Sequence, residues 1–270
     1  MGYILEKVDE AARLEEQSLM SAYSMQEELK FLRVSPSQET PFRMLDAGCG
    51  SGVLSRYLSE HFMGTSIEAC DFSEHRIRQA KTRCQLPSHH KIHFFTSALE
   101  QLSVPDESYD LVICRYVYEH LANHSKVTSE FFRVLKPGGT VYLIDFDGII
   151  FNLYHQNKRL GRLISKFKAN LGLDLFIGRK MPGLLCAAQF QDVQWTVEAI
   201  SFQGLNLQNE YRLMQQRLVF ALPALKKALG SRKLAIEFKD LYCHEMLQPG
   251  SSLFYNKFIV HGVKPMGKKI

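Results

Sequence analysis

The strongest constraint on the fold lies in residues 44–52, where an apolar run is followed by an acid and a glycine-rich turn. The segment reads Met-Leu-Asp-Ala-Gly-Cys-Gly-Ser-Gly, and the residues from Val53 to Leu58 continue at helical spacing. This order predicts a buried strand, a tight loop and the start of a helix. Glycines in such a loop tolerate positive φ and let backbone N–H groups approach a bound nucleoside.

A second acid, Asp71, closes another short apolar strand that begins at Ile67. Its distance from Gly50 suits a carboxylate that accepts hydrogen bonds from ribose hydroxyls. The first loop reads D-x-G-x-G-x-G. It lacks the third glycine of the dinucleotide pattern G-x-G-x-x-G, because Val53 stands at that position. A nucleotide site is therefore predicted, and a hydride-transfer enzyme is disfavoured.

Strands and helices alternate through the first half of the chain. Strands are predicted at 43–47, 66–70, 92–96, 109–114 and 140–146, and helices at 53–61, 74–83 and 125–135. Such alternation implies a parallel sheet covered by helices on both faces, with ligands bound beyond the carboxyl ends of the strands. Five side chains are expected at that edge, namely Asp46, Asp71, Ser97, Arg115 and Asp145.

Two later segments complete an ordered set of motifs. The strand at 109–114 is apolar, and residues 135–139 read L-K-P-G-G before the strand at 140–145. With residues 46–52, this set resembles the class I S-adenosylmethionine-dependent methyltransferases of the small-molecule type, over about residues 44–147. The resemblance implies an α/β fold, a Rossmann-like doubly wound sheet of seven mostly parallel strands, the last one antiparallel, with helical cap insertions.

The resemblance and the hydrophobic pattern together divide the chain into three parts. Residues 1–42 are expected to form helices that cover the cofactor site, with two short helices over 5–33, and residues 43–150 to form the S-adenosylmethionine-binding core. Residues 151–270 are expected to complete the sheet, with strands at 193–201 and 254–263. Their remaining segments, 151–177 and 204–250, are predicted to be cap helices that shield the transferred methyl group from water. The apolar stripe expected for the first cap helix begins at Leu153.

S-adenosyl-L-methionine is the cofactor that the resemblance implies. Its binding roles are assigned to the positions of this sequence that match the motifs of the family. Its methionine and ribose parts would lie in the loop formed by Asp46, Gly48, Cys49, Gly50 and Gly52. Asp71 would bind the ribose hydroxyls, Phe72 would pack against the adenine, and Arg115 would complete the cofactor set. Ser97 and Ala98 stand where the family often has an acid and a small residue facing the adenine amino group. Ser97 departs from that pattern, so adenine recognition would shift to backbone groups or remain open.

Candidate substrate residues follow the fourth strand and line one cap helix. Tyr116 and Tyr118 occupy the segment that lines the transferred methyl in similar enzymes, with packing against the cap as the alternative. Tyr211 and Met214 are the residues of the cap expected to face the acceptor, again with core packing as the alternative. No essential general base is expected. His120 is the first candidate for a catalytic base if the acceptor is a phenol or an alcohol.

These features predict an enzyme that methylates an oxygen, nitrogen or carbon atom of a small-molecule acceptor. The alternatives are an RNA or protein methyltransferase that uses the basic residues of 158–180, and a non-catalytic S-adenosylmethionine-binding protein. Cys114 to Val117 lacks the Asn/Asp-Pro-Pro-aromatic motif of base N-methyltransferases, which argues against a nucleic-acid partner. The basic run is interpreted as a solvated helix face, with an acidic substrate, an anionic lipid or a nucleic acid as alternative partners.

Composition sets the remaining expectations. With 270 residues, 46% hydrophobic and 23% charged, the chain has the composition of an ordinary globular protein. No apolar run approaches the ~18 residues of a membrane span, and the first residues lack the long apolar region of a signal peptide. The six scattered cysteines are expected to be buried in a reducing compartment, and a cytoplasmic location is predicted. No metal is expected, because His89, His90 and His93 lack a carboxylate partner at ligand spacing. The acceptor and the oligomeric state are left open.

Overall fold

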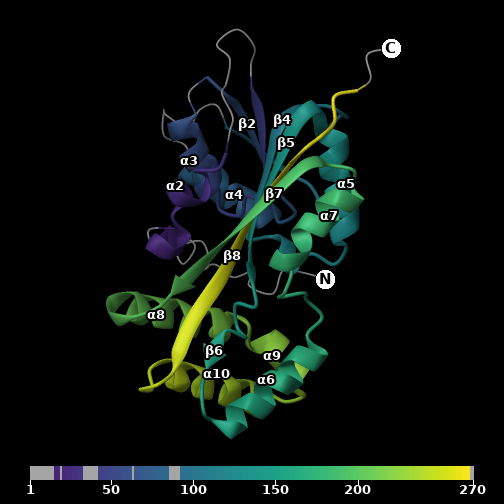
Figure 1. Cartoon of the computed structure of the whole chain (residues 1–270). Coiled ribbons are helices and arrows are strands. Elements are labelled where there is room, and N and C mark those ends of the chain that lie inside the picture. Colours follow the sequence, from purple (N-terminus) through teal and green to yellow (C-terminus); the bar gives the residue numbers. More distant parts are fainter. Residues whose placement is uncertain (1–14, 19, 33–41, 63, 85–91, 268–270) are drawn as a thin grey trace.

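The computed structural model describes residues 15–18, 20–32, 42–62, 64–84 and 92–267 (Figure 1). Part of the N-terminal segment expected to be helical lies outside these ranges, as do His89 and His90. In the described part, residues 15–18 are helical, and they are followed by a 3-10 turn, Ser21–Tyr23, and by the short helix α2, Met25–Glu28.

The described strands form one sheet with the order β3-β2-β1-β4-β5-β8, and β7 pairs with the other edge of β8. Their bounds are β1 Arg43–Ala47, β2 Ser66–Asp71, β3 Ile92–Thr96, β4 Tyr109–Arg115, β5 Leu135–Asp147, β6 Leu153–Tyr154, β7 Gln191–Ser201 and β8 Ser252–Val263. Strands β1 to β5 pair in parallel, whereas β8 runs antiparallel to both β5 and β7. The predicted Rossmann-like α/β fold with an antiparallel last strand is confirmed.

The strand count was predicted as seven, and the described residues contain an eighth short strand. Strand β6 lies inside the first cap segment and pairs Leu153 with Leu253 and Tyr154 with Ser252. The cap helix α6 therefore begins at Lys158 rather than near Leu153, as had been predicted. Asn157 explains this start, because its side-chain oxygen accepts hydrogen bonds from the backbone N–H groups of Arg159 and Leu160.

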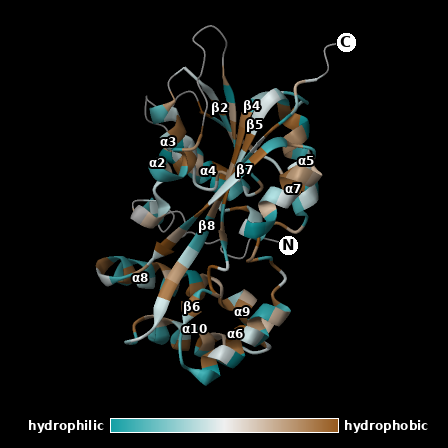
Figure 2. Ribbon diagram, in the orientation of Figure 1, coloured by the Kyte–Doolittle hydropathy of each residue, from teal (hydrophilic) through white to brown (hydrophobic). Residues whose placement is uncertain are grey.

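Helices cover both faces of the parallel strands, as the alternating pattern predicted. The bounds are α3 Val53–His61, α4 Glu74–Arg83, α5 His124–Val134 and α7 Met181–Ala187, with 3-10 turns η3 Tyr118–His120 and η4 Gly178–Lys180. Leu54 and Leu58 of α3 pack on one face of the sheet, whereas Val127 and Phe131 of α5 pack on the other. Figure 2 shows the strands between these helices coloured mainly hydrophobic.

The L-K-P-G-G motif, which was predicted to precede a strand, forms the first five residues of β5. Tyr109 of β4 pairs with Leu135, but Leu111, two residues further on, pairs with Thr140. Residues 136–139 therefore bulge out of the ladder. Gly138 adopts φ +80°, and a Cβ on Gly139 would lie 2.8 Å from the carbonyl oxygen of Lys136, so both positions favour glycine.

A helical cap lies beyond the carboxyl end of β5 (Figure 1). It consists of α6 Lys158–Asn170, α8 Gly204–Phe220, α9 Leu222–Leu229 and α10 Arg232–Met246, together with β6 and the first residues of β8. One buried cluster joins these helices to the end of the sheet, and it includes Phe146, Leu160, Leu213, Phe238 and Tyr255. The N-terminal segment contributes Tyr23 to the same cluster, so the cap and the N-terminal segment share one core.

Other sequence expectations can be compared with the described ranges. None of the helices described there combines the length and apolarity that a membrane crossing requires. Over the same residues, no group of three or more histidine, cysteine, aspartate or glutamate side chains is arranged to hold a metal ion. Five of the six cysteines are buried, and Cys186 is exposed, contrary to expectation.

Candidate active site

Three glycines shape the loop between β1 and α3, and all three have positive φ. Gly48, Gly50 and Gly52 adopt φ +82°, +53° and +81°. The backbone N–H groups of Gly48 and Cys49 both donate to the carbonyl oxygen of Cys70, at 2.8 and 2.9 Å. The loop is thereby fixed to the end of β2, with the start of α3 beside it.

Gly48 also sets the distance between this loop and the segment after β4. A Cβ added to Gly48 would lie 2.5 Å from Cγ2 of Val117, which is closer than carbon atoms can approach. A larger residue at position 48 would therefore push the two segments apart. The glycine serves close packing as well as backbone conformation.

Asp71 lies at the carboxyl end of β2 and is oriented by two backbone groups. Its Oδ2 accepts a hydrogen bond from Gly50 N at 3.0 Å, and its Oδ1 accepts one from Ser73 N at 2.9 Å. A carboxylate oxygen can accept more than one hydrogen bond, so a carboxylate oriented in this way suits binding of ribose hydroxyls. The next residue, Phe72, keeps 49% of its surface exposed, which suits packing against a planar base.

Asp46 is buried at the end of β1, behind the glycine loop. It accepts a hydrogen bond from the Ser55 hydroxyl at 2.5 Å. Burial raises the pKa of this carboxyl to about 6, against the opposing effect of the Ser55 hydrogen bond. A bound cation, such as the ammonium or sulfonium group of S-adenosylmethionine, would favour the ionised form of this carboxyl.

A buried hydroxyl in the same loop has no partner among the described residues. Ser51 is 3% exposed, and its Oγ makes no hydrogen bond there. Buried hydroxyls are almost always satisfied, so an orphan beside a glycine loop indicates the position of a ligand polar atom. The acid, the orphan hydroxyl and the ribose-type carboxylate together fit a nucleoside cofactor with a charged amino-acid part.

The raised pKa of Asp46 predicts a specific pH dependence of stability. Between about pH 4 and pH 6 the folded protein keeps a proton that the unfolded chain has lost, so the stability of the ligand-free protein falls as pH rises through this window. Asp46→Asn keeps an acceptor for Ser55 but cannot ionise, so we expect it to remove about 2–3 kcal/mol of this decline. Thermal unfolding of both proteins at pH 4 and pH 7 measures the effect. Identical pH dependence in the two proteins would contradict it.

Ser97 and Ala98 lie close to this site, but the Ser97 hydroxyl has a structural task. Ser97 N donates to the carbonyl oxygen of Asp71 at 3.0 Å, which places the two strand ends side by side. The Ser97 Oγ accepts from Ser103 N at 3.1 Å and so closes the loop after β3. Ala98 is exposed and forms an isolated bridge with Gln101. A part for this segment in adenine binding stays a prediction.

Arg115 is engaged by the N-terminal segment. Its Nε donates to Glu28 Oε2 at 2.5 Å, and its Nη2 donates to the carbonyl oxygen of Tyr23 at 2.9 Å. The guanidinium also lies over the Tyr116 ring, 4.4 Å from the ring centroid. The structure thus shows Arg115 as an anchor for residues 23–28, and its predicted contact with the cofactor stays a prediction.

Tyr116 carries the local strain of the site. It adopts φ +57°, which is uncommon for a bulky residue. Residues in such strained conformations cluster at functional sites. Its ring stacks on Phe146 at 4.8 Å and meets Tyr23 edge to face at 5.9 Å. Its hydroxyl donates to Glu28 Oε1 at 2.5 Å. The residue thus joins the end of β4, the end of β5 and the N-terminal segment.

Two predicted substrate residues are buried within packed clusters. Tyr118 is buried against α5, and its hydroxyl is 3.0 Å from Thr128 Oγ1, so it lies in the core between sheet and helix. Met214 is 1% exposed and lies inside the cap cluster. Tyr211, on the same helix, is partly buried, and its hydroxyl accepts from Gln215 Nε2 at 2.9 Å. Of the three, Tyr211 alone retains a partly accessible side chain.

His120 lies in a small acidic cluster beyond β4 and β5. Its Nε2 is 3.4 Å from Glu119 Oε1, and Glu119 N donates to Asp145 Oδ2 at 3.1 Å. Burial, reinforced by the nearby Glu119 carboxylate, raises the pKa of the Asp145 carboxyl well above its usual range. The cluster therefore combines a buried acid with a histidine that an adjacent glutamate can orient.

Sequence reasoning missed two buried ionic networks that hold the N-terminal segment. Glu28, fully buried, pairs with Arg115 and with Lys257 Nζ at 2.9 Å. Burial opposes ionisation of Glu28, but the nearby Arg115 and Lys257 charges outweigh it and lower the pKa of this carboxyl. In the second network, Glu210 accepts from Tyr255 at 2.7 Å and from Tyr23 at 3.2 Å, and it pairs with Arg217. No local pattern marked these glutamates, since their partners are distant in sequence.

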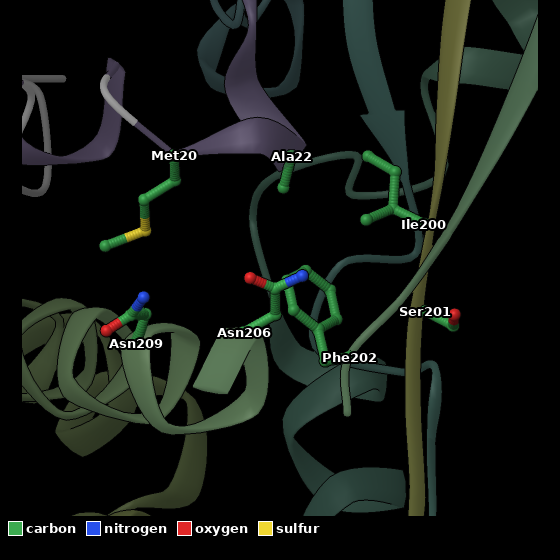
Figure 3. A pocket seen from close by; sticks show the side chains of 7 residues that line it. All are labelled: Met20, Ala22, Ile200, Ser201, Phe202, Asn206 and Asn209. Carbon is green, nitrogen blue, oxygen red and sulfur yellow. The ribbon is translucent and has the colours of Figure 1, made fainter. Parts of the chain in front are cut away.

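A cavity of about 290 Å³ opens between the N-terminal segment, the end of β7 and α8. Figure 3 shows side chains from all three elements, with Met20 and Ala22 facing the Asn206 and Asn209 side chains. Its lining is uncharged, consisting of Met20, Ala22, Ile200, Ser201, Phe202, Asn206 and Asn209. On α8, Asn206 and Asn209 line this cavity, whereas the predicted Tyr211 and Met214 do not.

Comparisons with known proteins agree with this geometry. Residues 45–143 match the family described as "Methyltransferase domain". A demethylmenaquinone methyltransferase of Thermus thermophilus is 27% identical over 137 residues, covering 47% of this chain and 62% of that protein. A ubiquinone biosynthesis O-methyltransferase of Dechloromonas aromatica is 35% identical over 103 residues, covering 37% of this chain and 43% of that protein.

A solved structure resembles almost the whole chain. The phosphoethanolamine N-methyltransferase 2 of Haemonchus contortus, in complex with S-adenosyl-L-methionine, matches with a TM-score of 0.61 and 19% identity, covering 98% of this chain and 61% of that chain. At this identity the likeness shows the fold alone. The chain spans about half the length of the curated relatives it matches. The family match identifies residues 45–143 as a methyltransferase domain, and the curated relatives and the shared fold agree with the class I S-adenosylmethionine-dependent type.

Proposed function

We propose that this protein transfers the methyl group of S-adenosyl-L-methionine to a small-molecule acceptor. The observation that carries the proposal is the arrangement of side chains and backbone groups at the ends of β1 and β2. There Asp71 is oriented by Gly50 N at 3.0 Å and Ser73 N at 2.9 Å, beside the unpartnered buried hydroxyl of Ser51. Relatives named demethylmenaquinone methyltransferase and ubiquinone biosynthesis O-methyltransferase support an acceptor of low molecular mass.

In this proposal the chain contributes binding and positioning. S-adenosylmethionine, when bound, supplies an electrophilic methyl group and its own leaving group. The glycine loop, Asp46 and Asp71 would hold the cofactor, and Phe72 would pack against its adenine. The cap and the N-terminal segment, joined through Tyr23, would exclude water and hold the acceptor against the cofactor. Residues 15–18 also approach the cofactor loop, since Glu15 pairs with Arg56 of α3 and Arg83 of α4.

The function is tested with S-adenosylmethionine carrying an isotopic label in its methyl group. The purified protein is incubated with the labelled cofactor and a panel of phenols, alcohols, amines and carbon acids. Production of S-adenosylhomocysteine that depends on an acceptor supports the proposal. Tight cofactor binding without transfer to any member of the panel would favour a non-catalytic binding protein instead.

We propose His120 as the base for an acceptor that reacts through a hydroxyl group. The support is its position 3.4 Å from Glu119 Oε1, beside the end of β4. His120→Gln should then lower kcat/KM by about 10²-fold for a phenol and leave cofactor affinity within about twofold. Loss of the acidic limb of the pH–rate profile in the variant distinguishes this role from a structural one. Equal rates for the two proteins would remove His120 from the mechanism.

We expect the uncharged cavity lined by Asn206 to bind an uncharged part of the acceptor. We expect Asn206→Ala to raise KM for the acceptor about five- to tenfold, because one hydrogen bond between uncharged groups contributes about 1 kcal/mol. Gln208→Ala is the matched control, since Gln208 is an exposed amide of the same helix that does not line the cavity. Steady-state kinetics and cofactor calorimetry compare the two variants. Equal changes in both variants would contradict acceptor binding in this cavity.

A further inference from the structure

Tertiary contacts separate the cations of the basic run at 158–180 into those that have a carboxylate or aromatic partner and those that do not. Arg159 pairs with Glu237, Arg179 with Asp147, and Lys180 with Asp174. Lys168 lies over the Phe176 ring, 4.4 Å from its centroid. Two exposed cations in the middle of α6, Arg162 and Lys166, have no carboxylate partner among the described residues.

The packing of α6 brings these two cations to the turn between α9 and α10. Arg159 Nε lies 2.6 Å from Glu237 Oε1, in the second turn of α10. Seven residues further along α6, Lys166 Nζ would be 3.7 Å from a Cβ on Gly230, which ends α9. Helix α6 therefore runs antiparallel to the first half of α10, and Arg162, between these two contacts, faces the first turns of α10.

Residues from three helices thus form one basic surface, which we term the cap cation surface. Its members are all exposed, and they are Arg162, Lys166, Lys226, Lys227, Arg232 and Lys233. The acids of these helices are Glu237, Asp240 and Glu245, and each is already engaged, by Arg159, Lys239 and Asn157 respectively. Of these cations, Lys233 lies near the Glu237 carboxylate, whereas no ion pair joins the other five to an acid among the described residues. Figure 2 shows hydrophilic and hydrophobic residues alternating along α6, on the part of the molecule that Figure 1 places away from β2 and β4.

An apolar side chain lies within this surface. Ile236 keeps 37% of its surface exposed and stands three and four residues after Lys233 and Arg232, on the same face of α10. Exposed apolar groups among lysines and arginines are typical of helices that lie on a bilayer, where the cations meet lipid phosphates and the apolar group enters the headgroup region. A cluster of four to eight cations on such helices is typical of binding to anionic lipid.

We propose that the cap cation surface docks this protein on an anionic lipid bilayer. Charge complementarity carries the proposal, since the surface combines six exposed cations, five of them without a carboxylate partner among the described residues, with one exposed isoleucine. The surface is built from α6, α9 and α10, whereas the cofactor residues lie on β1, β2 and the loops after them. Docking is therefore independent of the proposed methyl transfer, and it can be tested without catalysis.

The experiment measures sedimentation of the full chain with lipid vesicles at low salt. We expect binding to vesicles of phosphatidylcholine mixed with phosphatidylglycerol, and much weaker binding to phosphatidylcholine alone. Lys166→Gln with Lys233→Gln should weaken binding about 30-fold, since each cation near the bilayer contributes about one factor of five. The matched control is Lys81→Gln with Lys126→Gln, which removes the same charge from exposed lysines of α4 and α5. Raising the salt concentration should weaken binding of the unaltered protein.

Two outcomes would overturn the proposal. Equal weakening in both double variants would show that net charge, and not the cap cation surface, drives binding. Failure to bind the phosphatidylglycerol vesicles, or a tighter and salt-sensitive gel shift with RNA under the same conditions, would exclude a lipid partner. Thermal unfolding of each variant checks that the exposed substitutions leave the fold intact.

Discussion

Asp71→Ala is expected to lower the affinity for S-adenosylmethionine by about ten- to hundredfold. The side chain would lose charge-assisted hydrogen bonds to the ribose, which contribute roughly 1.5–3 kcal/mol. The same substitution removes the acceptors for Gly50 N and Ser73 N, so the glycine loop would also be less well oriented. Calorimetric titration with S-adenosylmethionine and with S-adenosylhomocysteine measures the change.

The control for this prediction is Asp106→Ala, which removes a carboxylate that is 74% exposed and lies in the loop before β4. That variant should bind the cofactor with unchanged affinity. Asp71→Asn should fall between the two, since the amide keeps one acceptor oxygen. If Asp71→Ala folds normally and binds as tightly as the unaltered protein, the ribose assignment is wrong.

Glu28→Gln is expected to destabilise the fold by about 3–5 kcal/mol. Glu28 is fully buried between Arg115 and Lys257. The substitution would leave Arg115 without its ion-pair partner and Lys257 with only the more distant Glu198, at 3.6 Å. Its lowered pKa gives the pH dependence of this contribution. The stabilisation is present above the unfolded pKa near 4.5 and is lost as pH falls through the lower folded pKa.

The neighbouring Glu27→Gln is the matched control. Glu27 pairs with Lys30 at 3.0 Å, but both side chains are largely exposed, at 58% and 45% respectively. Exposed pairs of this kind contribute about 0–1 kcal/mol, so this variant should unfold close to the unaltered protein. Denaturant unfolding at pH 7 and pH 4 compares the two. Similar midpoints for both variants would show that the Glu28 network does not hold the N-terminal segment.

The fold and the cofactor loop could be predicted from the sequence because their determinants are local. The run from Met44 to Gly52 combines a buried strand with three glycines, and each of those glycines adopts positive φ in the structure. Asp71 is the last residue of β2, so the parallel pairing of β1 and β2 brings it to the same edge as the glycine loop. Likewise, Ser73 belongs to the residue types that favour helix starts, and its side chain accepts from Arg76 N at the start of α4.

The acceptor side of the site depended on tertiary structure. Helical periodicity identified α8 but could not tell which of its faces meets the cap core, and Met214 proved to be buried there. Asn206 and Asn209 carried no sequence signal, because asparagine on a helix is usually solvated. Their place in the cavity depends on how α8 packs against Met20 and Ala22, which lie far earlier in the sequence, before the first strand of the sheet.

Charges show the same division between local pattern and long-range contact. The sequence by itself determined a basic run at 158–180, because composition is a local property. Only the tertiary structure decided that Arg159 and Arg179 are neutralised by distant acids, while Arg162 and Lys166 join cations of α9 and α10. Glu28 and Glu210 likewise found their partners across the fold. The periodicity of hydrophobic residues and the conformational freedom of glycine can be recognised in the local sequence. The partner of a charged side chain depends instead on which elements the packed core brings together.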